Sequence, residues 1–242
     1  MTMLKETEPP LLFDSRVALT SVLFRENDYT ETVAERFGLV IPDTMRCAVR
    51  KRRAEYVAGR TCARRSIQRL NGIPNWSGHT LPNGQPQWPS GMVGTITHTA
   101  GYAAAAVALE DDHTSIGMDT QYIMKDSVQD EIGPNVCDPR KWLPVQGLMS
   151  LCEFTTLMFS AKEAAAKCLY PLVGRMFWMR DIQIDVAKPT AGLFQATLLV
   201  DLSDELTTGT RLLGSYILAR PFIHTGLSVA LASLKARKLR ST

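Results

Sequence analysis

Two short segments constrain this chain more than any other part of it. Residues 116–119 form an apolar stretch that ends in Asp119, and residues 159–167 have the spacing of a helix. In the second segment Glu163 and Lys167 stand four residues apart, so a helix places both side chains on one face. The sequence therefore predicts a strand and a helix that bring charged side chains to one site.

Asp119 and Glu163 together can hold Mg²⁺ over a polyphosphate. Magnesium binds oxygen ligands, uses one or two protein carboxylates and leaves its other positions to phosphate and water. Lys167 can neutralise charge while a phosphoryl group moves. Two simpler interpretations stay open, because Ser160 and Glu163 also fit a capping box and an aspartate after a strand commonly starts a turn.

The composition fits a soluble protein with a full core. The chain has 242 residues, 45% of them hydrophobic, which is enough for one large domain or two lobes. Its net charge of +3 is too small to indicate nucleic acid. The five cysteines include no C-x-x-C pair, so we expect reduced thiols in a cytoplasm, without a disulfide framework or zinc site. We expect neither a signal peptide nor a membrane span, since no run of about 18 apolar residues occurs.

The pattern of apolar and turn residues predicts a mixture of strands and helices. The expected elements are a strand at 14–24, a basic helix from about Asp43 to Leu70 capped by Asn71-Gly72, a hairpin at 93–110, a strand at 114–120, helices at 146–157 and 160–170, and strands at 182–185, 193–202 and 214–232. Residues 125–145 are expected to be irregular. Gly59 indicates a close approach or a local break, and Pro171 should end the last helix.

The basic helix and His98 have ordinary interpretations of their own. A basic helix is most often a solvated face, and it can also bind nucleic acid, although few aromatic residues are present here for base stacking. A histidine in an alternating strand is more often packed than catalytic. The sequence has no motif of dinucleotide enzymes, P-loop NTPases, serine hydrolases or zincins.

Several motifs occur in the order and spacing of a known family. They are Lys51-Arg52-Arg53-x-Glu55-Tyr56, Gly59-Arg60 with Cys62-Ala63-Arg64, Gln85-Pro86-x-Trp88-Pro89, Gly94-Thr95-Ile96-Thr97-His98, Ile116-Gly117-Met118-Asp119, and Phe159-Ser160-Ala161-Lys162-Glu163-x-x-x-Lys167 with Tyr170-Pro171. With them the chain resembles the 4′-phosphopantetheinyl transferases of the larger, two-lobed type. More narrowly, it resembles the siderophore-synthase (enterobactin component D-like) and actinobacterial carrier-protein activators.

The resemblance implies an α+β fold of two similar lobes related by a pseudo-twofold. Each lobe would be an antiparallel sheet packed on a long helix, with residues 1–112 in the N-terminal lobe and residues 113–242 in the C-terminal lobe. The lobes would form one functional unit with coenzyme A (CoA) in the cleft between them. A monomer would therefore suffice.

The activity implied is transfer of the 4′-phosphopantetheine arm of CoA to a serine of an acyl or peptidyl carrier protein, with release of 3′,5′-ADP. The expected cofactor is Mg²⁺. The expected partners are CoA and the carrier protein, with no nucleic acid and no membrane. We accordingly expect a cytoplasmic enzyme of siderophore or polyketide biosynthesis.

The resemblance also implies a role for individual residues. Asp119 and Glu163 would ligate Mg²⁺ that bridges the CoA pyrophosphate, Glu163 would take the serine proton, and Lys167 would stabilise charge on the phosphates. Lys162 would assist at the pyrophosphate. The other residues implied for CoA are Arg52 and Arg60 at the 3′-phosphate, Thr97 and His98 at the phosphates, and Thr80, Asn83, Gly84, Gln85 and Pro86 in the loop that borders the adenine.

Two positions depart from the family's pattern. Where the family has a second acidic residue, this chain has Gln121, whose amide oxygen can coordinate the metal or hold a metal-bound water but brings no charge. We therefore expect two protein carboxylates and weaker or more Mg²⁺-sensitive activity. The loop at 79–85 lacks the lysine often found there, and the basic helix would compensate.

Two other functions stay open on the sequence alone. One is a degenerate relative, marked by Gln121, that binds CoA without turnover. The other is a non-enzymatic protein whose basic helix binds nucleic acid or an acidic partner, which leaves Asp119, Glu163 and Lys167 without a role. Transfer would stop with a chelator, whereas binding to a phosphate backbone would depend on salt.

Overall fold

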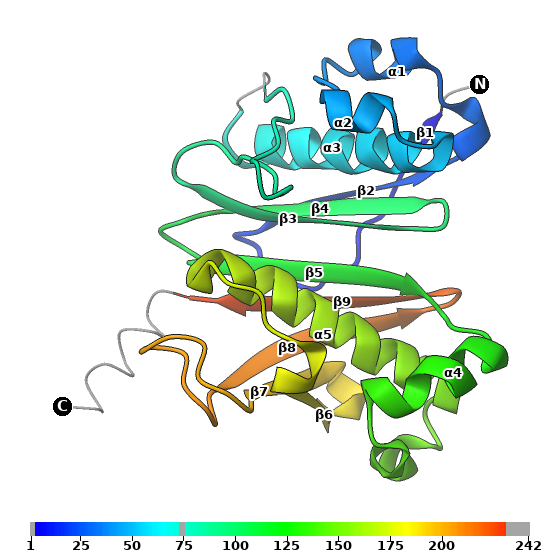
Figure 1. Ribbon diagram of the computed structural model, residues 1–242, viewed down its shortest axis with the longest axis vertical. Helices are drawn as coiled ribbons and strands as arrows, with labels where there is room; N and C mark the ends of the chain where they lie inside the picture. Colours follow the sequence, from blue (N-terminus) through cyan, green and yellow to red (C-terminus); the bar gives the residue numbers. More distant parts are fainter. Residues whose placement is uncertain (1–2, 73–75, 231–242) are drawn as a thin grey trace. The chain divides into compact units, whose positions relative to one another are not determined.

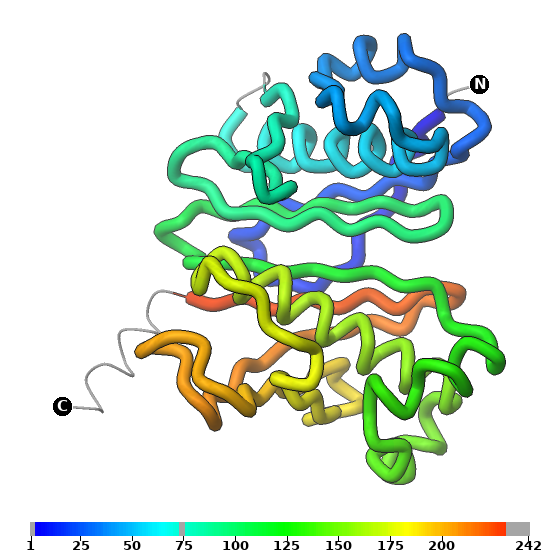
Figure 2. Tube along the Cα trace, in the orientation of Figure 1, coloured from blue at the N-terminus to red at the C-terminus, as the bar shows by residue number. Residues whose placement is uncertain are grey.

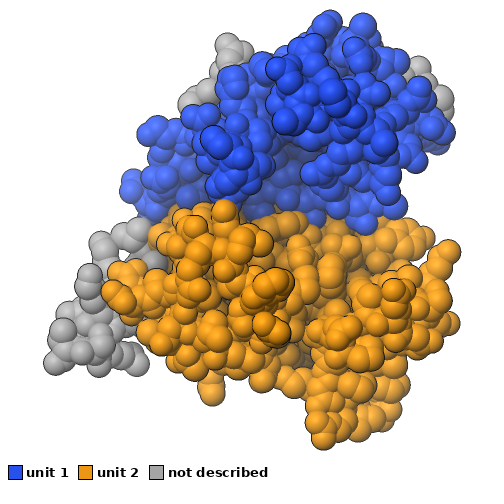
Figure 3. Space-filling view, in the orientation of Figure 1, with its two compact units in different colours: residues 1–9, 14–112 blue, residues 10–13, 113–242 orange. Residues whose placement is uncertain are grey.

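The computed structural model describes residues 3–72 and 76–230, and the chain divides into two compact units. Unit 1 is Met1–Pro9 with Asp14–Asp112, and unit 2 is Pro10–Phe13 with His113–Thr242 (Figure 3). Each unit has its own antiparallel sheet and one long helix (Figures 1 and 2). The α+β class with two antiparallel sheets is therefore confirmed.

The sheet of unit 1 has four antiparallel strands in the order β1-β2-β4-β3. The elements are β1 (Leu4–Thr7), β2 (Ala18–Phe24), η1 (Glu26–Asp28), α1 (Glu31–Arg36), α2 (Asp43–Arg46), α3 (Arg50–Asn71), β3 (Met92–Thr99) and β4 (Tyr102–Leu109). The predicted hairpin is confirmed as β3 and β4. The long helix α3 packs on β2, β3 and β4 (Figure 1).

Small residues let α3 approach this sheet closely. β4 contains a run of alanines and is buried along all but its last residue. A Cβ on Gly59 would lie 2.7 Å from Ile96 Cγ2, which confirms the predicted close approach. The helix ends as predicted at Gly72, which is left-handed (φ 74°) and donates its N–H to the Gln68 carbonyl.

The sheet of unit 2 has five antiparallel strands in the order β5-β9-β8-β7-β6. The elements are β5 (Ser115–Tyr122), α4 (Asp126–Val136), η2 (Pro139–Val145), α5 (Leu151–Val173), η3 (Met179–Asp181), β6 (Ile182–Lys188), η4 (Pro189–Ala191), β7 (Leu193–Leu198), β8 (Arg211–Ala219) and β9 (Phe222–Val229). The long helix α5 packs on β5 and β9, and α4 packs on α5. No helix within residues 3–72 or 76–230 has the length and apolarity needed to cross a membrane.

Gly117 sets how closely α5 packs on β5. A Cβ at this position would stand 2.0 Å from the Ala164 carbonyl oxygen and 2.5 Å from the Cys168 backbone nitrogen. Both atoms belong to the backbone of α5, so they can move only with the helix. Ser115 adds a hydrogen bond from its hydroxyl to the Cys168 carbonyl at 2.6 Å. These contacts fix β5 against the middle of α5.

The prediction of two helices at 146–157 and 160–170 is wrong, because α5 is continuous. Its N-cap is Ser150, whose hydroxyl accepts from the Glu153 N–H at 3.2 Å while the Glu153 carboxylate accepts from the Ser150 N–H at 2.8 Å. The capping box considered for Ser160 and Glu163 is therefore wrong, since both residues lie in the helix interior. Glu163 does not cap the helix, so its carboxylate is available for a role in the site.

The helical regions differ from the prediction at three further places. Pro171 lies in the last turn of α5, which continues to its left-handed cap at Gly174. The basic helix predicted from Asp43 is divided into α2 (Asp43–Arg46) and α3, which begins at Arg50 because Val49 is extended (φ −61°, ψ 153°). Residues 125–145 are largely helical, and Pro139 takes the first position of η2, where a missing N–H is no loss.

The strand predicted at residues 214–232 is instead part of a hairpin. β8 ends at Ala219 and β9 begins at Phe222, and the two strands pair antiparallel. Residues 231–232 of that prediction lie outside the described residues.

We expect Gly117→Ala to destabilise the protein. The added methyl group has to displace the α5 backbone, and overpacking of this kind typically costs about 1–3 kcal/mol. Thermal unfolding should therefore show a lower Tm, by about 2–4 °C per kcal/mol for a chain of this size. Gly147→Ala is the matched control, because a Cβ there meets no atom within 4 Å. Equal Tm values for the two variants would contradict the close packing.

Candidate active site

Unit 2 gathers charged side chains where β5 packs on α5. We call this group the carboxylate cluster, and its members are Asp119 and Gln121 on β5 and Ser160, Glu163 and Lys167 on α5. Side chains alternate along a strand, so Asp119 and Gln121 share the side of Gly117, which touches α5. The contact at Gly117 therefore brings the two groups of side chains together.

Asp119 is buried and its carboxylate is held on both oxygens. The Lys167 ammonium donates to Oδ1 at 2.7 Å. The Gln121 amide and the Ser160 hydroxyl donate to Oδ2 at 2.8 and 3.0 Å. A carboxylate bound from both sides in this way has a fixed orientation.

Glu163 is half-buried and its carboxylate accepts no hydrogen bond from any described residue. Burial raises the pKa of Glu163, and the nearby charge of Asp119 raises it further, while Lys167 acts in the opposite direction. An unbonded carboxylate whose pKa is raised can accept a proton or bind a cation.

Gln121 meets Asp119 through its amide nitrogen. A carboxylate only accepts hydrogen bonds, so the contact at 2.8 Å has to come from the amide N–H. Gln121 therefore orients Asp119, and its role as a metal ligand remains a prediction.

Lys162 is not brought to the carboxylate cluster. Its ammonium donates to the Met179 carbonyl at 2.9 Å, in η3, and burial lowers its pKa. Neighbouring helix residues point about 100° apart, so Lys162 lies on the other flank of α5 from Glu163. Its predicted role at the pyrophosphate has no supporting contact here.

The cluster suits a hard divalent cation. Asp119 and Glu163 supply two carboxylates, and their mutual repulsion is relieved by a cation. Within the described residues no group of three or more histidine, cysteine, aspartate or glutamate side chains is placed to hold a metal. A metal here would therefore take most of its ligands from elsewhere, as Mg²⁺ does with phosphate and water.

Unit 1 contains a separate cavity of about 310 Å³, which we call the arginine cavity. Its lining includes the predicted residues Arg52, Arg60, Thr80, Gly84, Pro86 and His98, together with Glu55, Tyr56, Gly59 and Ile96. Residues that lie far apart in the sequence thus meet at one cavity, formed by α3, the loop that follows it and β3.

Arg60 is a buried cation in this cavity, with 5% of the residue exposed. Its guanidinium lies over the Tyr56 ring at 5.1 Å and the Trp76 ring at 5.6 Å, and donates to Thr80 Oγ1 at 2.9 Å. Burial lowers its pKa. Its Nη1 has no hydrogen-bond partner among the described residues. A buried donor of this kind is expected to meet an anionic ligand.

His98 and Arg52 lie together at the cavity. Arg52 Nη1 and His98 Nε2 are 2.8 Å apart, and both residues approach the Glu55 carboxylate, at 3.5 and 3.7 Å. His98 is therefore partly exposed beside two charged side chains, and its role at the CoA phosphates remains a prediction. Thr97 is buried and points to the opposite side of β3 from His98, so the structure does not place it in the cavity.

The loop that borders the cavity is a tight turn. The Leu81 and Gln85 backbones are hydrogen bonded at 2.8 Å, and Asn83 Oδ1 accepts from the Gln85 N–H at 3.1 Å. Asn83 and Gln85 therefore shape the turn, while Thr80, Gly84 and Pro86 line the cavity.

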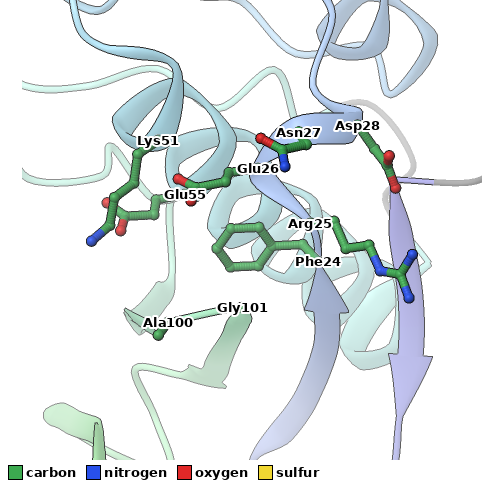
Figure 4. A pocket seen from close by; sticks show the side chains of 9 residues that line it. All are labelled: Phe24, Arg25, Glu26, Asn27, Asp28, Lys51, Glu55, Ala100 and Gly101. Atoms are coloured by element: carbon green, nitrogen blue, oxygen red, sulfur yellow. The ribbon is translucent and has the colours of Figure 1, made fainter.

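A larger cavity of about 520 Å³ lies beside Glu55, between η1, the start of α3 and the β3–β4 turn. Figure 4 shows Glu26, Glu55 and Lys51 converging on one side of it. The whole lining has three carboxylates (Glu26, Asp28 and Glu55) against two cations (Arg25 and Lys51), a balance that disfavours a phosphate. The arginine cavity is therefore the better site for an anion.

The basic side chains of α3 are largely engaged within unit 1. Arg53 pairs with Glu31 at 2.9 Å, and Arg65 and Arg69 both pair with Glu6. These pairs reduce the charge that α3 can offer to a nucleic acid. The arrangement therefore favours a small anionic ligand at Arg52 and Arg60 over a nucleic-acid backbone.

Sequence reasoning assigned no role to Tyr56, Trp76 and Glu55, which surround Arg60 and His98. Trp76 also stacks on Trp88, with ring centroids 5.4 Å apart. Tyr56 precedes Arg60 by four residues in α3, so helix spacing alone places its ring beside Arg60. Only the folded loop after α3 brings Trp76 to Arg60.

The chain was compared with known proteins. Residues 41–108 match the 4′-phosphopantetheinyl transferase N-terminal domain, and residues 115–219 match the 4′-phosphopantetheinyl transferase superfamily. These two ranges contain every residue of the arginine cavity and of the carboxylate cluster.

Similar proteins from several bacteria carry related names. The chain is 35% identical over 192 residues to "4′-phosphopantetheinyl transferase Svp" of Streptomyces mobaraensis, covering 75% of each chain. It is 30% identical to "4′-phosphopantetheinyl transferase PptT" of Mycobacterium tuberculosis, over 76% of this chain and 83% of the relative. It is 35% identical to "Enterobactin synthase component D" of Salmonella typhimurium, over 52% of this chain and 51% of the relative.

We expect Glu163→Gln to stabilise the metal-free protein. A carboxyl group whose pKa is raised on folding stabilises the fold at low pH and loses that contribution as pH rises through the folded pKa. The neutral amide removes this loss, so at pH 7 with EDTA the unfolding free energy should rise, by about 0.5–2 kcal/mol. Exposed Glu131→Gln is the control. A lower stability of Glu163→Gln under these conditions would contradict the described electrostatics.

Proposed function

Because the chain belongs to the 4′-phosphopantetheinyl transferase superfamily, we propose that it moves the 4′-phosphopantetheine arm of CoA to a serine of an acyl or peptidyl carrier protein. The other product is 3′,5′-ADP. The observation that carries this proposal is the carboxylate cluster, in which Asp119, Glu163 and Lys167 meet at the contact of β5 with α5.

The arginine cavity is proposed to bind the 3′-phosphate of CoA. Arg60 has a buried N–H without a partner, and no carboxylate of the described residues lies within ion-pair distance of it. Arg52 and His98 lie in the same cavity. Charge-assisted hydrogen bonds from a guanidinium to phosphate are strong and directional.

Asp119 and Glu163 are the residues that would hold Mg²⁺. When bound, the metal would neutralise charge on the pyrophosphate. Gln121 would keep Asp119 oriented through its amide N–H. Lys167 neutralises Asp119 in the protein alone, and we propose that its ammonium also stabilises the phosphates of bound CoA.

Glu163 is proposed as the base of the reaction. The serine oxygen attacks the phosphorus next to the pantetheine arm, and the bond from that phosphorus to the oxygen of 3′,5′-ADP breaks. The serine proton passes to Glu163, directly or through a water. A carboxylate whose pKa is raised is better suited to accept this proton at neutral pH than an ordinary glutamate.

The pseudo-twofold relation of the two units is also proposed. In support of it, three strands of each sheet have the same order. In each unit the strand before the long helix (β2 or β5) pairs with the last strand (β4 or β9), which pairs with the strand before it (β3 or β8). The sheets differ in their remaining strands, since β1 lies beyond β2 whereas β7 and β6 lie beyond β8. The shared order of three strands is consistent with a duplicated lobe.

We further propose a cytoplasmic enzyme that acts as a monomer. All five cysteines are free thiols, as expected in a reducing compartment. Carrier proteins of siderophore or polyketide biosynthesis are the proposed acceptors, because the relatives include an enterobactin synthase component.

Arg60→Gln should weaken selection for the 3′-phosphate. The wild type should prefer CoA over dephospho-CoA, and the variant should lose about 10- to 100-fold of that preference, the usual contribution of hydrogen bonds to a charged group. The ratio of kcat/KM for the two substrates measures this. Arg140→Gln, which changes an exposed arginine of unit 2, should keep the wild-type ratio. If the ratio of kcat/KM for the two substrates is equal in all three proteins, Arg60 does not contact the 3′-phosphate.

Gln121→Glu should lower the Mg²⁺ concentration that half-saturates transfer. A carboxylate in place of the amide adds a negative ligand, and the shift should be on the order of tenfold. A magnesium titration of the initial rate measures it, with exposed Gln146→Glu as the control. An unchanged titration would indicate that residue 121 stays away from the metal.

The function itself is tested with an apo carrier protein, CoA and Mg²⁺, by chromatography of released 3′,5′-ADP. The wild type should release it, and EDTA or Asp119→Asn should abolish release while CoA still binds. CoA binding without release from the wild type would indicate a degenerate relative. Neither binding nor release would contradict the proposed function.

A further inference from the structure

Two buried hydroxyls link Asp119 to the strand beside it. Thr225 on β9 is the cross-strand partner of Asp119, and Ser160 comes from α5. Neither Ser160 nor Thr225 is exposed to solvent. Ser160 Oγ lies 3.0 Å from Asp119 Oδ2 and 2.8 Å from Thr225 Oγ1. Ser160 on α5 thus bonds directly to the Asp119 carboxylate on β5, and Thr225 on β9 is connected to that carboxylate through Ser160.

The chemistry of these groups fixes the direction of the hydrogen bonds. An ionised carboxylate only accepts, so the single proton of Ser160 is donated to Asp119. The contact between the hydroxyls then has to be donated by Thr225. The alternative acceptor for Thr225, the Asp119 carbonyl, is more distant at 3.4 Å. The chain of donors therefore runs from Thr225 to Ser160 to Asp119.

Ser160 is a buried polar residue on the side of α5 that packs on β5, and Glu163 and Lys167 follow it on that side three and seven residues further along. Leu157, Ala161 and Ala164 around it are fully buried. Burying a hydroxyl costs free energy unless it is hydrogen bonded, and alanine would fill the same place with a better helix propensity. The bond to Asp119 provides a reason for a serine at this position.

We propose that Ser160 and Thr225 are positioning residues that hold the Asp119 carboxylate ready for a divalent cation. The inference rests on the proposed function, in which Asp119 is a ligand of the metal. Lys167 and Gln121 reach the carboxylate with longer side chains that are partly exposed. The Ser160 hydroxyl approaches the carboxylate from the buried side, and Thr225 holds that hydroxyl through the bond at 2.8 Å. Groups that orient a metal ligand commonly change metal affinity or activity 10- to 100-fold when removed.

The test measures Mn²⁺ binding by electron paramagnetic resonance, without CoA or carrier protein. Ser160→Ala should raise the Kd for Mn²⁺ by about tenfold or more. Ser160→Cys keeps the volume of the side chain but donates weakly, so it should fold as the wild type and also bind Mn²⁺ less tightly. Thr225→Val should act in the same direction. Combined with Ser160→Ala it should add little, because both changes break one chain of hydrogen bonds.

Ser115→Ala is the matched control. Ser115 lies on β5 like Asp119 and is a buried serine like Ser160. Its hydroxyl bonds to the Cys168 carbonyl of α5 at 2.6 Å and makes no bond to Asp119. Removal of the Ser115 hydroxyl should lower Tm about as much as Ser160→Ala does, and should leave the Kd for Mn²⁺ unchanged. This comparison separates orientation of Asp119 from a general loss of packing between β5 and α5.

The inference is wrong if both Ser160 variants bind Mn²⁺ as tightly as the wild type, or if Ser115→Ala weakens binding equally. It is also wrong if the wild type binds no Mn²⁺. Transfer activity is a separate readout. A wild type that binds Mn²⁺ and shows the Ser160 effect, yet transfers no phosphopantetheine, would contradict the proposed function and support the inference.

Discussion

The close approach of α5 to β5 at Gly117 is the contact on which the proposed active site depends. Because position 117 has no Cβ, the Ala164 carbonyl and the Cys168 amide of α5 come within reach of the strand. Asp119 is two residues further along the same face of β5, so it meets the α5 side chains directly. Lys167 can then bond to Asp119 at 2.7 Å, and Glu163 comes close enough for the Asp119 charge to raise its pKa. One glycine thus determines whether the charged groups form a site.

Each unit has charged side chains that lack a counter-charge, and the sign of the charge differs between the units. The arginine cavity of unit 1 has a buried guanidinium N–H of Arg60 without a partner. The carboxylate cluster of unit 2 has Asp119 and Glu163 in repulsion, with Lys167 as the cation bonded to Asp119. A phosphate would provide the missing partner for Arg60, and a divalent cation would relieve the repulsion between Asp119 and Glu163. CoA carries a 3′-phosphate and a pyrophosphate that can bind such a cation, which connects the electrostatics of each unit to the proposed reaction.

The parts that sequence predicted well are local ones. The spacing of Glu163 and Lys167 and the strand that contains Asp119 follow from helix and strand periods, and the structure brings all three residues together. The predicted end of that strand at Asp119 is wrong, because β5 continues to Tyr122. Ser160 was misjudged because a serine three residues before a glutamate looks the same at a helix start and in a helix interior. Lys162 adjoins Glu163 in sequence but points to η3. The stacking of Tyr56 on Arg60 follows from their spacing of four residues in α3, whereas the approach of Trp76 depends on the folded loop after α3, which no local pattern specifies.

The central claim is that Asp119 and Glu163 jointly hold the metal of a CoA complex. Anomalous diffraction from crystals grown with CoA and Mn²⁺ tests this most directly, because manganese is distinguished from water and from other atoms by its own signal. The account predicts a single strong peak in contact with carboxylate oxygens of both residues and with the CoA pyrophosphate, and Lys167 turned toward phosphate. A peak that contacts neither carboxylate, with Lys167 still bonded to Asp119, would contradict it.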